Sequence, residues 1–370
     1  MKNIKNYVLN NLFLSKRVII DKPGFIIHCA SAFYGLKQSK KRIIYFFEDD
    51  FIDLQKNTIK DIGKKKASFL YYKIGKDFVT RHLNFSSSKS PPLFLKSYLI
   101  KRIFESFSSA GMSIGDNVSF NENNNSIVLH GKDNIISRKT KDLSLFCGIV
   151  SGVLSYFCGM NIEAKSLNNE KIIANQNIKK KYISNINKKI DLAKYNKSNL
   201  PIKNNSHNPI YPSLKDLMKF NKVRHKEGKH WFKEHLIIPM EIGIPEIYVK
   251  HYEQNDLLHL LKQSLLKSSE KRAKFIFDRK SISDDIIKLS SILCGLGWGK
   301  LIIKIDKGEI SCHFISAPIT SGDFLFQSLI LNGYLNYILN RKYYFSSVET
   351  STTKIPKIKI IYEMKEKGPL

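Results

Sequence analysis

Residues 49–72, DDFIDLQKNTIKDIGKKKASFLYY, align without a gap on residues 255–278, NDLLHLLKQSLLKSSEKRAKFIFD. The alignment places Phe51 on Leu257 and keeps most of the apolar positions in step. Each segment has the apolar spacing of an amphipathic helix that runs into a second apolar element. A match of this length within one chain predicts two copies of the same structural unit.

Further segments recur downstream in the same order in both halves of the chain. The pairs are GMSIGDNVSF (111–120) with GLGWGKLIIK (295–304), SIVLHG (126–131) with ISCHFIS (310–316), DLSLFCGIVSGVLSYFCG (142–159) with DFLFQSLILNGYLNYILN (323–340), and MNIEAKSL (160–167) with YYFSSVET (343–350). These pairs predict, in order, a turn into a strand, an alternating strand, a long buried helix and a closing strand.

The two long apolar helices also share details. Asp142 and Asp323 stand where an N-cap residue is expected. Gly152 and Gly333 lie at matching positions inside the helices, where glycine lowers helix stability. We expect a close approach of another helix at each glycine, because that contact would explain the missing side chain.

The order helix, helix, strand, turn, strand, long helix, strand predicts an α+β fold in each half. We expect two related domains, residues 1–165 and 223–370, each with helices packed on a small antiparallel sheet. A chain of 370 residues is about twice the usual domain length, which agrees with two domains. Residues 166–222 are polar and rich in Lys and Asn, so we expect a linker there.

The chain is strongly basic, with 61 Lys and Arg residues against 32 Asp and Glu and a formal net charge of +29. Such a charge is typical of proteins that bind nucleic acid or anionic membranes. However, only nine of the basic residues are Arg, and phosphate-binding surfaces favour the bidentate guanidinium group. Nucleic-acid binding therefore stays an alternative function, and the strip predicted for it is Lys179, Lys180, Lys181 and Tyr182.

The cysteines and the amino-terminal residues predict a cytoplasmic protein. There are five cysteines, an odd number, without a CxxC pair and mostly inside apolar runs, as expected for free thiols in a reducing compartment. Residues 1–20 lack the continuous apolar segment of a signal peptide.

Residues 143–162 contain no charged residue over about the length of a membrane-spanning helix. Ser144, Ser151 and Ser155 interrupt this segment, and the matching helix of the second half contains Gln327. We therefore expect buried core helices and no membrane span.

No cofactor or metal motif is present in the sequence. GxxxxGK[ST] and GxGxxG are both absent, and GLGWG at 295–299 precedes a strand instead of opening a helix. His225, His230 and His235 are five residues apart, whereas zinc ligands on one helix face are three or four apart. We predict neither a cofactor nor a metal site.

Cys312 and His313 are adjacent and resemble a nucleophile with its base. Adjacent residues of a strand point to opposite faces, which argues against such a pair. No catalytic residue is predicted, and the sequence favours a binding protein over an enzyme.

The overall pattern resembles the 4-vinyl reductase domain family, present here in tandem. This family is similar in fold to a subunit of the TRAPP vesicle-tethering complex and to the ligand-sensing domains of aromatic-responsive bacterial regulators. The resemblance rests on KKKASFLYYKIGKDF (64–78), on the GMSIG and GLGWGK turns, and on the helices that carry SGVLSYFCG and NGYLNYILN. Some members have a cysteine-rich metal site after the last helix, and neither half of this chain has Cys or His there.

The resemblance implies an apolar pocket between helices and sheet in each domain, and a homodimer in many members. His130 and His313 fall in matching strands, and Tyr156 and Tyr337 fall in the matching long helices. We predict that these four residues line the two pockets, where the histidines would orient the polar head of a ligand. The leading hypothesis is a non-enzymatic or regulatory protein that holds a small apolar molecule or a protein partner.

Overall fold

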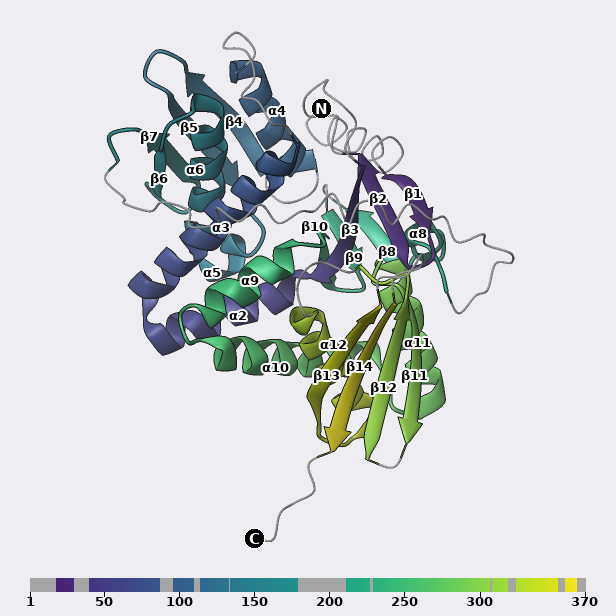
Figure 1. Cartoon of the computed structure of the whole chain (residues 1–370). Helices are drawn as coiled ribbons and strands as arrows, with labels where there is room; N and C mark the ends of the chain where they lie inside the picture. Colours follow the sequence, from purple (N-terminus) through teal and green to yellow (C-terminus); the bar gives the residue numbers. More distant parts are fainter. Residues whose placement is uncertain are drawn as a thin grey trace.

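A computed structural model of the chain describes residues 18–29, 40–86, 96–109, 114–132, 134–178, 211–226, 229–306, 308–318, 324–351 and 357–364. It is a mixed α+β structure in which every described strand pair is antiparallel (Figure 1). We call residues 18–178 the first half and residues 211–364 the second half.

The elements of the first half are β1 (Val18–Lys22), β2 (Phe25–Cys29), β3 (Lys40–Phe47), α2 (Glu48–Ile62), α3 (Lys64–Ser86), α4 (Lys96–Ser109), β4 (Ile114–Asn121), β5 (Ser126–Lys132), α5 (Ser137–Thr140), α6 (Ser144–Cys158), β6 (Glu163–Ser166) and β7 (Lys171–Asn175). Those of the second half are α8 (Leu214–Lys219), β8 (Val223–Lys226), β9 (Lys229–Phe232), β10 (His235–Glu241), α9 (Ile244–Glu253), α10 (Leu258–Ile276), α11 (Ile282–Gly295), β11 (Lys300–Asp306), β12 (Glu309–Ile315), α12 (Leu325–Leu339), β13 (Tyr343–Ser351) and β14 (Lys357–Met364).

A six-stranded sheet joins the two halves. Its order is β1-β2-β3-β10-β9-β8, so β3 of the first half pairs with β10 of the second, with Tyr45 opposite Pro239. Trp298, in the turn before β11, donates its indole N–H to the carbonyl oxygen of Tyr45 at 2.8 Å. The domain boundary predicted at residue 223 therefore cuts through this sheet, with β1–β3 on one side of the boundary and β8–β10 on the other.

Each half also has a four-stranded sheet of its own. The orders are β4-β5-β7-β6 and β11-β12-β14-β13, so the strands of the two sheets are connected in the same way. In the second sheet, Ile310, Cys312 and Phe314 of β12 are fully buried. Tyr362 of β14 donates its hydroxyl to the carbonyl oxygen of Ser328 on α12 at 2.8 Å, so α12 packs on this inner face.

β7 lies inside the predicted linker, residues 166–222, and pairs with β5. The first sheet therefore continues to Asn175, and α8 also falls within the predicted linker. The strip at 179–182 lies outside the described residues.

The long helices of both halves pack closely on a neighbouring helix, as their glycines predict. A Cβ added at Gly152 of α6 would lie 2.8 Å from the Cβ of Val79 on α3. One added at Gly333 of α12 would lie 2.5 Å from the carbonyl oxygen of Leu266 on α10. Such distances leave no room for a side chain, so the prediction of close helix approaches is confirmed.

The helix starts were only partly predictable. The carboxylate of Asp142 accepts the backbone N–H of Ser144, the first residue of α6, at 2.8 Å. The residue at the cap position itself is Leu143. Asp323 lies outside the described residues.

The gap-free alignment of 49–72 with 255–278 places unlike elements together. Gly63 has a φ of 79° and separates α2 from α3. The aligned residue in the second segment is Ser269, which lies inside the continuous helix α10. The expectation of two elements in the second segment is therefore wrong, because serine lets the helix continue where glycine ends it.

A buried ion pair also connects the halves. Arg272 of α10 lies 2.8 Å from the carboxylate of Asp50 on α2, and both side chains are 1 % exposed. The Nε of Arg272 donates to the hydroxyl of Tyr334 at 2.6 Å. Burial lowers the pKa of Arg272, but Asp50 and Tyr334 together more than offset this effect and the pKa is raised overall, so the guanidinium stays charged.

Among the described helices, none has the length and hydropathy needed to cross a membrane. The uncharged segment 143–162 contains α6, whose buried residues belong to the protein core.

Candidate binding groove on the second sheet

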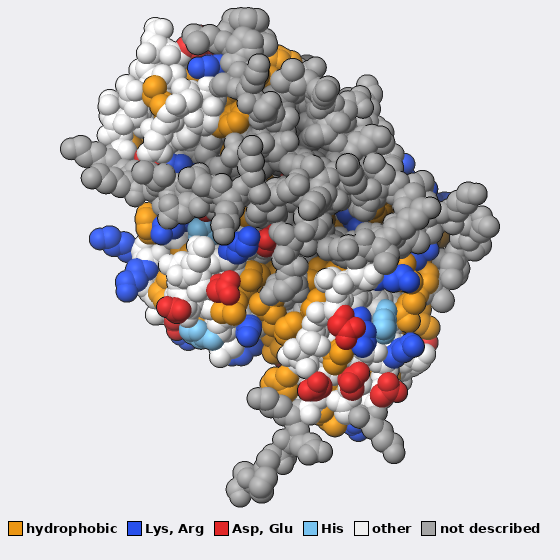
Figure 2. Space-filling view, in the orientation of Figure 1, with side chains coloured by type: hydrophobic (Ala, Val, Ile, Leu, Met, Phe, Trp, Pro, Cys, Tyr) orange, Lys and Arg blue, Asp and Glu red, His pale blue; other side chains and the backbone are white. Residues whose placement is uncertain are grey.

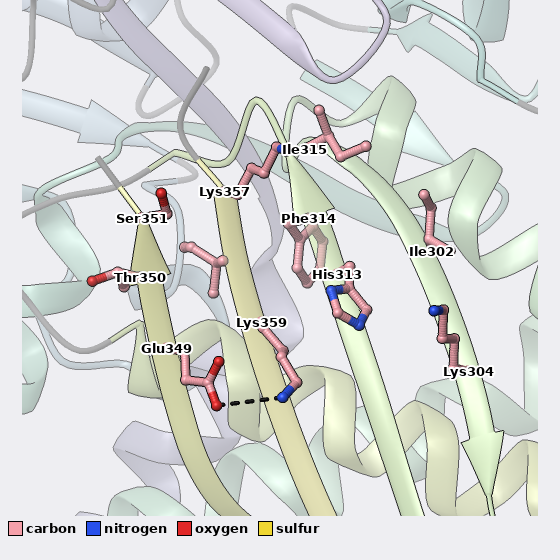
Figure 3. Close-up of a pocket in the computed structure, with 11 residues that line it drawn as sticks. Ile302, Lys304, His313, Phe314, Ile315, Glu349, Thr350, Ser351, Lys357 and Lys359 are labelled. Carbon is pink, nitrogen blue, oxygen red and sulfur yellow. Dashed lines mark hydrogen bonds and ion pairs between the residues drawn. The ribbon is translucent and has the colours of Figure 1, made fainter. Parts of the chain in front are cut away.

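The second sheet has a groove on the face opposite α12 (Figure 3). Its cavity volume is about 460 Å³, within the range typical of small-molecule sites. All four strands contribute to it, and the lining residues are Ile302, Lys304, His313, Phe314, Ile315, Glu349, Thr350, Ser351, Lys357, Ile358 and Lys359.

The strand register brings the polar residues of the groove together. Ile302 of β11 lies opposite His313 of β12, His313 lies opposite Lys359 of β14, and Lys359 lies opposite Glu349 of β13. Directly opposed residues point to the same face of a sheet, so these four side chains form one row across the groove.

The groove has an excess of positive charge. Lys304, Lys357 and Lys359 line it together with one carboxylate, that of Glu349, which lies 3.3 Å from the Nζ of Lys359. Figure 2 shows basic and histidine side chains on this face of the molecule, with acidic side chains at its lower end. An anion in the groove would therefore meet a net positive field.

His313 is neutral at neutral pH. Partial burial lowers its pKa below the ordinary value of 6.5, the positive charges of Lys304 and Lys359 lower it further, and Glu349 opposes them. Its Nε2 lies 3.4 Å from the hydroxyl oxygen of Ser311. An anion bound beside these lysines would favour the protonated imidazole.

Apolar side chains form the rest of the groove. Ile302 is 40 % exposed and Ile315 is half-buried, and both lie on the outer face. Phe314 and Ile358 also border the groove, but their buried side chains belong to the inner face of the sheet. The combination of two exposed or half-buried isoleucines with lysines and a histidine suits a ligand that carries both an apolar body and an anionic group.

The structure brings only one of the four predicted pocket residues into this groove. His313 lines it, whereas Tyr337 lies on α12, on the other side of the sheet, with the guanidinium of Arg279 5.3 Å from its ring centroid. The helices cover the inner face and the histidine points to the outer face, so the predicted pair does not meet.

The first half has the same separation. His130 of β5 is exposed and lies between Asn117 of β4 and Lys171 of β7. Tyr156 lies on α6 and makes an edge contact with Phe157, with ring centroids 5.3 Å apart. His130 and Tyr156 therefore do not form one pocket, although His130 and His313 both have a lysine opposite on the neighbouring strand.

An internal cavity is present where the halves meet, and it is small. It has a volume of about 30 Å³ and is lined by residues of α3, α6 and α9 together with Ile135, Ile136 and Met240. This volume is enough for about one water molecule and too small for an organic ligand. The pocket implied by the family resemblance thus has no counterpart at this place.

Reactive or metal-binding groups do not gather in the described part of the chain. No group of three or more His, Cys, Asp or Glu residues there could hold a metal ion. Cys147, Cys158, Cys294 and Cys312 form no disulfide with one another. Burial raises the pKa of Cys312, which faces away from the groove, so it does not form a reactive pair with His313.

Comparisons with models of protein families, with curated proteins and with solved structures found no match. The groove is therefore interpreted from its own geometry.

The lysines of the groove were missed by sequence reasoning, although a signal was present. In KIKIIYEM, residues 357–364, Lys357 and Lys359 are two positions apart and alternate with Ile358 and Ile360. This spacing places both lysines on the polar face of a strand.

Proposed function

We propose that this chain is a binding protein and that the groove on its second sheet holds small amphiphilic anions. The observation that carries the proposal is the meeting of Lys304, His313 and Lys359 beside the apolar side chains of Ile302 and Ile315 in a groove of about 460 Å³. A carboxylate, sulfonate or phosphate would contact the lysines, and the apolar part would cover Ile302 and Ile315.

A small anion fits this groove better than a nucleic acid does. Single-stranded nucleic acids bind sheets largely by stacking bases on exposed aromatic side chains. Among the groove residues, Phe314 is the one Phe, Tyr or Trp, and it is fully buried. The groove residues therefore provide positive charge but no exposed aromatic ring on which a base could stack.

We also propose that the two halves descend from one duplicated unit similar to the 4-vinyl reductase domain. This proposal is supported by the similar element order, in which three strands precede three helices, a strand pair, a long helix and a second strand pair; the short helices α5 and α8 have no counterpart. It is supported as well by the equal strand order of the two outer sheets.

The test is a calorimetric titration of the full chain with octanesulfonate, with octanol as the uncharged probe of the same chain length. We expect octanesulfonate to bind more tightly than octanol. The double variant K304M/K359M should raise the Kd for octanesulfonate about tenfold or more, because two charges near the anion are lost.

The matched control is Lys262→Met, which removes an exposed lysine from α10, away from the groove. It should leave the Kd unchanged. Equal binding of octanesulfonate by K304M/K359M and by the unaltered chain would contradict the proposal. If an oligothymidylate binds at low salt and depends on the same two lysines while octanesulfonate does not bind, nucleic acid becomes the better candidate.

A further inference from the structure

We propose that β11 is the contact strand of a homodimer, in which it pairs antiparallel with β11 of a second copy. β11 lies at the edge of the second sheet, and β12 is the one described strand that pairs with it. Ile302 and Ile305 on this strand are 40 % and 44 % exposed. An exposed apolar edge strand is a template for pairing with another chain.

The edge strands β13 and β4 of the two four-stranded sheets are less suited to such pairing. β13, at the opposite edge of the same sheet, has an irregular register between Phe345 and Ser347. β4, the edge of the first sheet that corresponds to β11, has one between Gly115 and Asn117. Bulges of this kind disturb the ladder and protect an edge from addition of a strand. β11 pairs with β12 without interruption from Lys300 to Asp306.

The sequence of β11, KLIIKID, is complementary to itself when two copies run antiparallel. With Ile303 opposite Ile303 of the second copy, Lys300 lies opposite Asp306 of the second copy, and the same ion pair occurs twice by symmetry. Leu301 then lies opposite Ile305 of the second copy, and Ile302 opposite Lys304 of the second copy. Both exposed isoleucines gain a cross-strand neighbour.

The charges also select this register over its neighbours. A slip of two residues in one direction places Lys300 opposite Lys304 of the second copy. A slip of two in the other direction places Lys304 opposite Lys304 of the second copy. Like charges directly opposite each other are destabilising, so both slipped registers lose the ion pairs and gain a repulsion.

This arrangement would join the second sheets of the two copies into one sheet of eight strands. Ile302 and Lys304 belong both to β11 and to the groove, so the grooves of the two copies would lie side by side. The dimer is inferred from the edge strand alone and does not depend on what the groove binds.

The test is sedimentation velocity of the full chain over about a hundredfold range of concentration. We expect the mean mass to rise with concentration towards that of two chains. The variant D306K places a second lysine opposite Lys300 of the other copy and should raise the Kd of the dimer about tenfold or more. Asp306 is exposed, so the substitution leaves the core intact.

The double variant K300D/D306K exchanges the two charges and should restore the dimer. Lys300 also lies 5.7 Å from the ring centroid of Tyr211, so the single change at Asp306 is the cleaner disruption. The matched control is Glu253→Lys, the same change of charge at an exposed position at the end of α9. A chain that stays monomeric at every concentration, or a D306K variant that dimerises as well as the unaltered chain, would overturn the proposal.

Discussion

At the scale of single residues, His313 links the groove to pH. Partial burial and the positive charges of Lys304 and Lys359 hold the pKa of His313 below 6.5, and a bound anion would counter the lysines and raise that pKa. Binding an anion therefore takes up a proton. The gain in affinity from protonated His313 is complete below the pKa of His313 in the free protein. It is lost as pH rises through the pKa of His313 in the complex.

We expect the Kd for octanesulfonate to fall about threefold to tenfold as pH is lowered from neutral to below the pKa of free His313, because one positive charge is added near the anion. The sulfonate keeps its charge over this range, so the change belongs to the protein. His313→Gln should remove the pH dependence. His130→Gln, at the corresponding strand position of the first sheet, should keep it, and loss of the dependence in both variants would point to a different group.

Single residues also mark the limit of sequence reasoning about the site. His313 could be singled out because it recurs in a matching strand, but Tyr337 was grouped with it by analogy alone. Whether a strand residue faces the covering helix or the outside depends on which face the helix covers. In β12, Cys312 and Phe314 are buried on the inner face under the helix, so His313 between them lies on the outer face.

At the scale of elements, the strongly patterned segments were predictable. The strand pairs at 114–132 and 300–315 and the two long helices follow from period-two and apolar patterns. β3 was not predictable, because Ile43, Ile44, Tyr45, Phe46 and Phe47 are all buried and the strand has no alternation. A strand buried on both faces has the same sequence signature as a short buried helix.

The shared central sheet was missed for a related reason. Pairing between β3 and β10 joins residues far apart in the chain. No tight turn connects the two strands, so no turn motif in the sequence indicates that they pair. The internal alignment likewise put α2 on α10, because amphipathic helices resemble one another whatever their place in the fold.

At the scale of the whole molecule, the halves form one unit through the central sheet and the buried pair of Asp50 and Arg272. We expect Asp50→Asn to lower the free energy of unfolding by about 3–5 kcal/mol, because it leaves a guanidinium buried between the halves without its counter-charge. Urea unfolding followed by circular dichroism measures this change.

The double variant D50L/R272M removes both charges and should be closer in stability to the unaltered chain than Asp50→Asn is. Asp61→Asn, an exposed position on the same helix, serves as the control and should change stability by less than about 0.5 kcal/mol. If Asp50→Asn is as mild as Asp61→Asn, the pair does not hold the halves together.

Photolabelling of the full chain tests directly whether the groove is the binding site. The probe is an alkyl sulfonate that carries a diazirine on its apolar end. Mass spectrometry of the digested protein then locates the label. We expect labelled peptides from β11, β12 and β14, with the yield reduced in K304M/K359M. Label confined to the residues around the small cavity between the halves, or no label that excess octanesulfonate can displace, would contradict the proposed site.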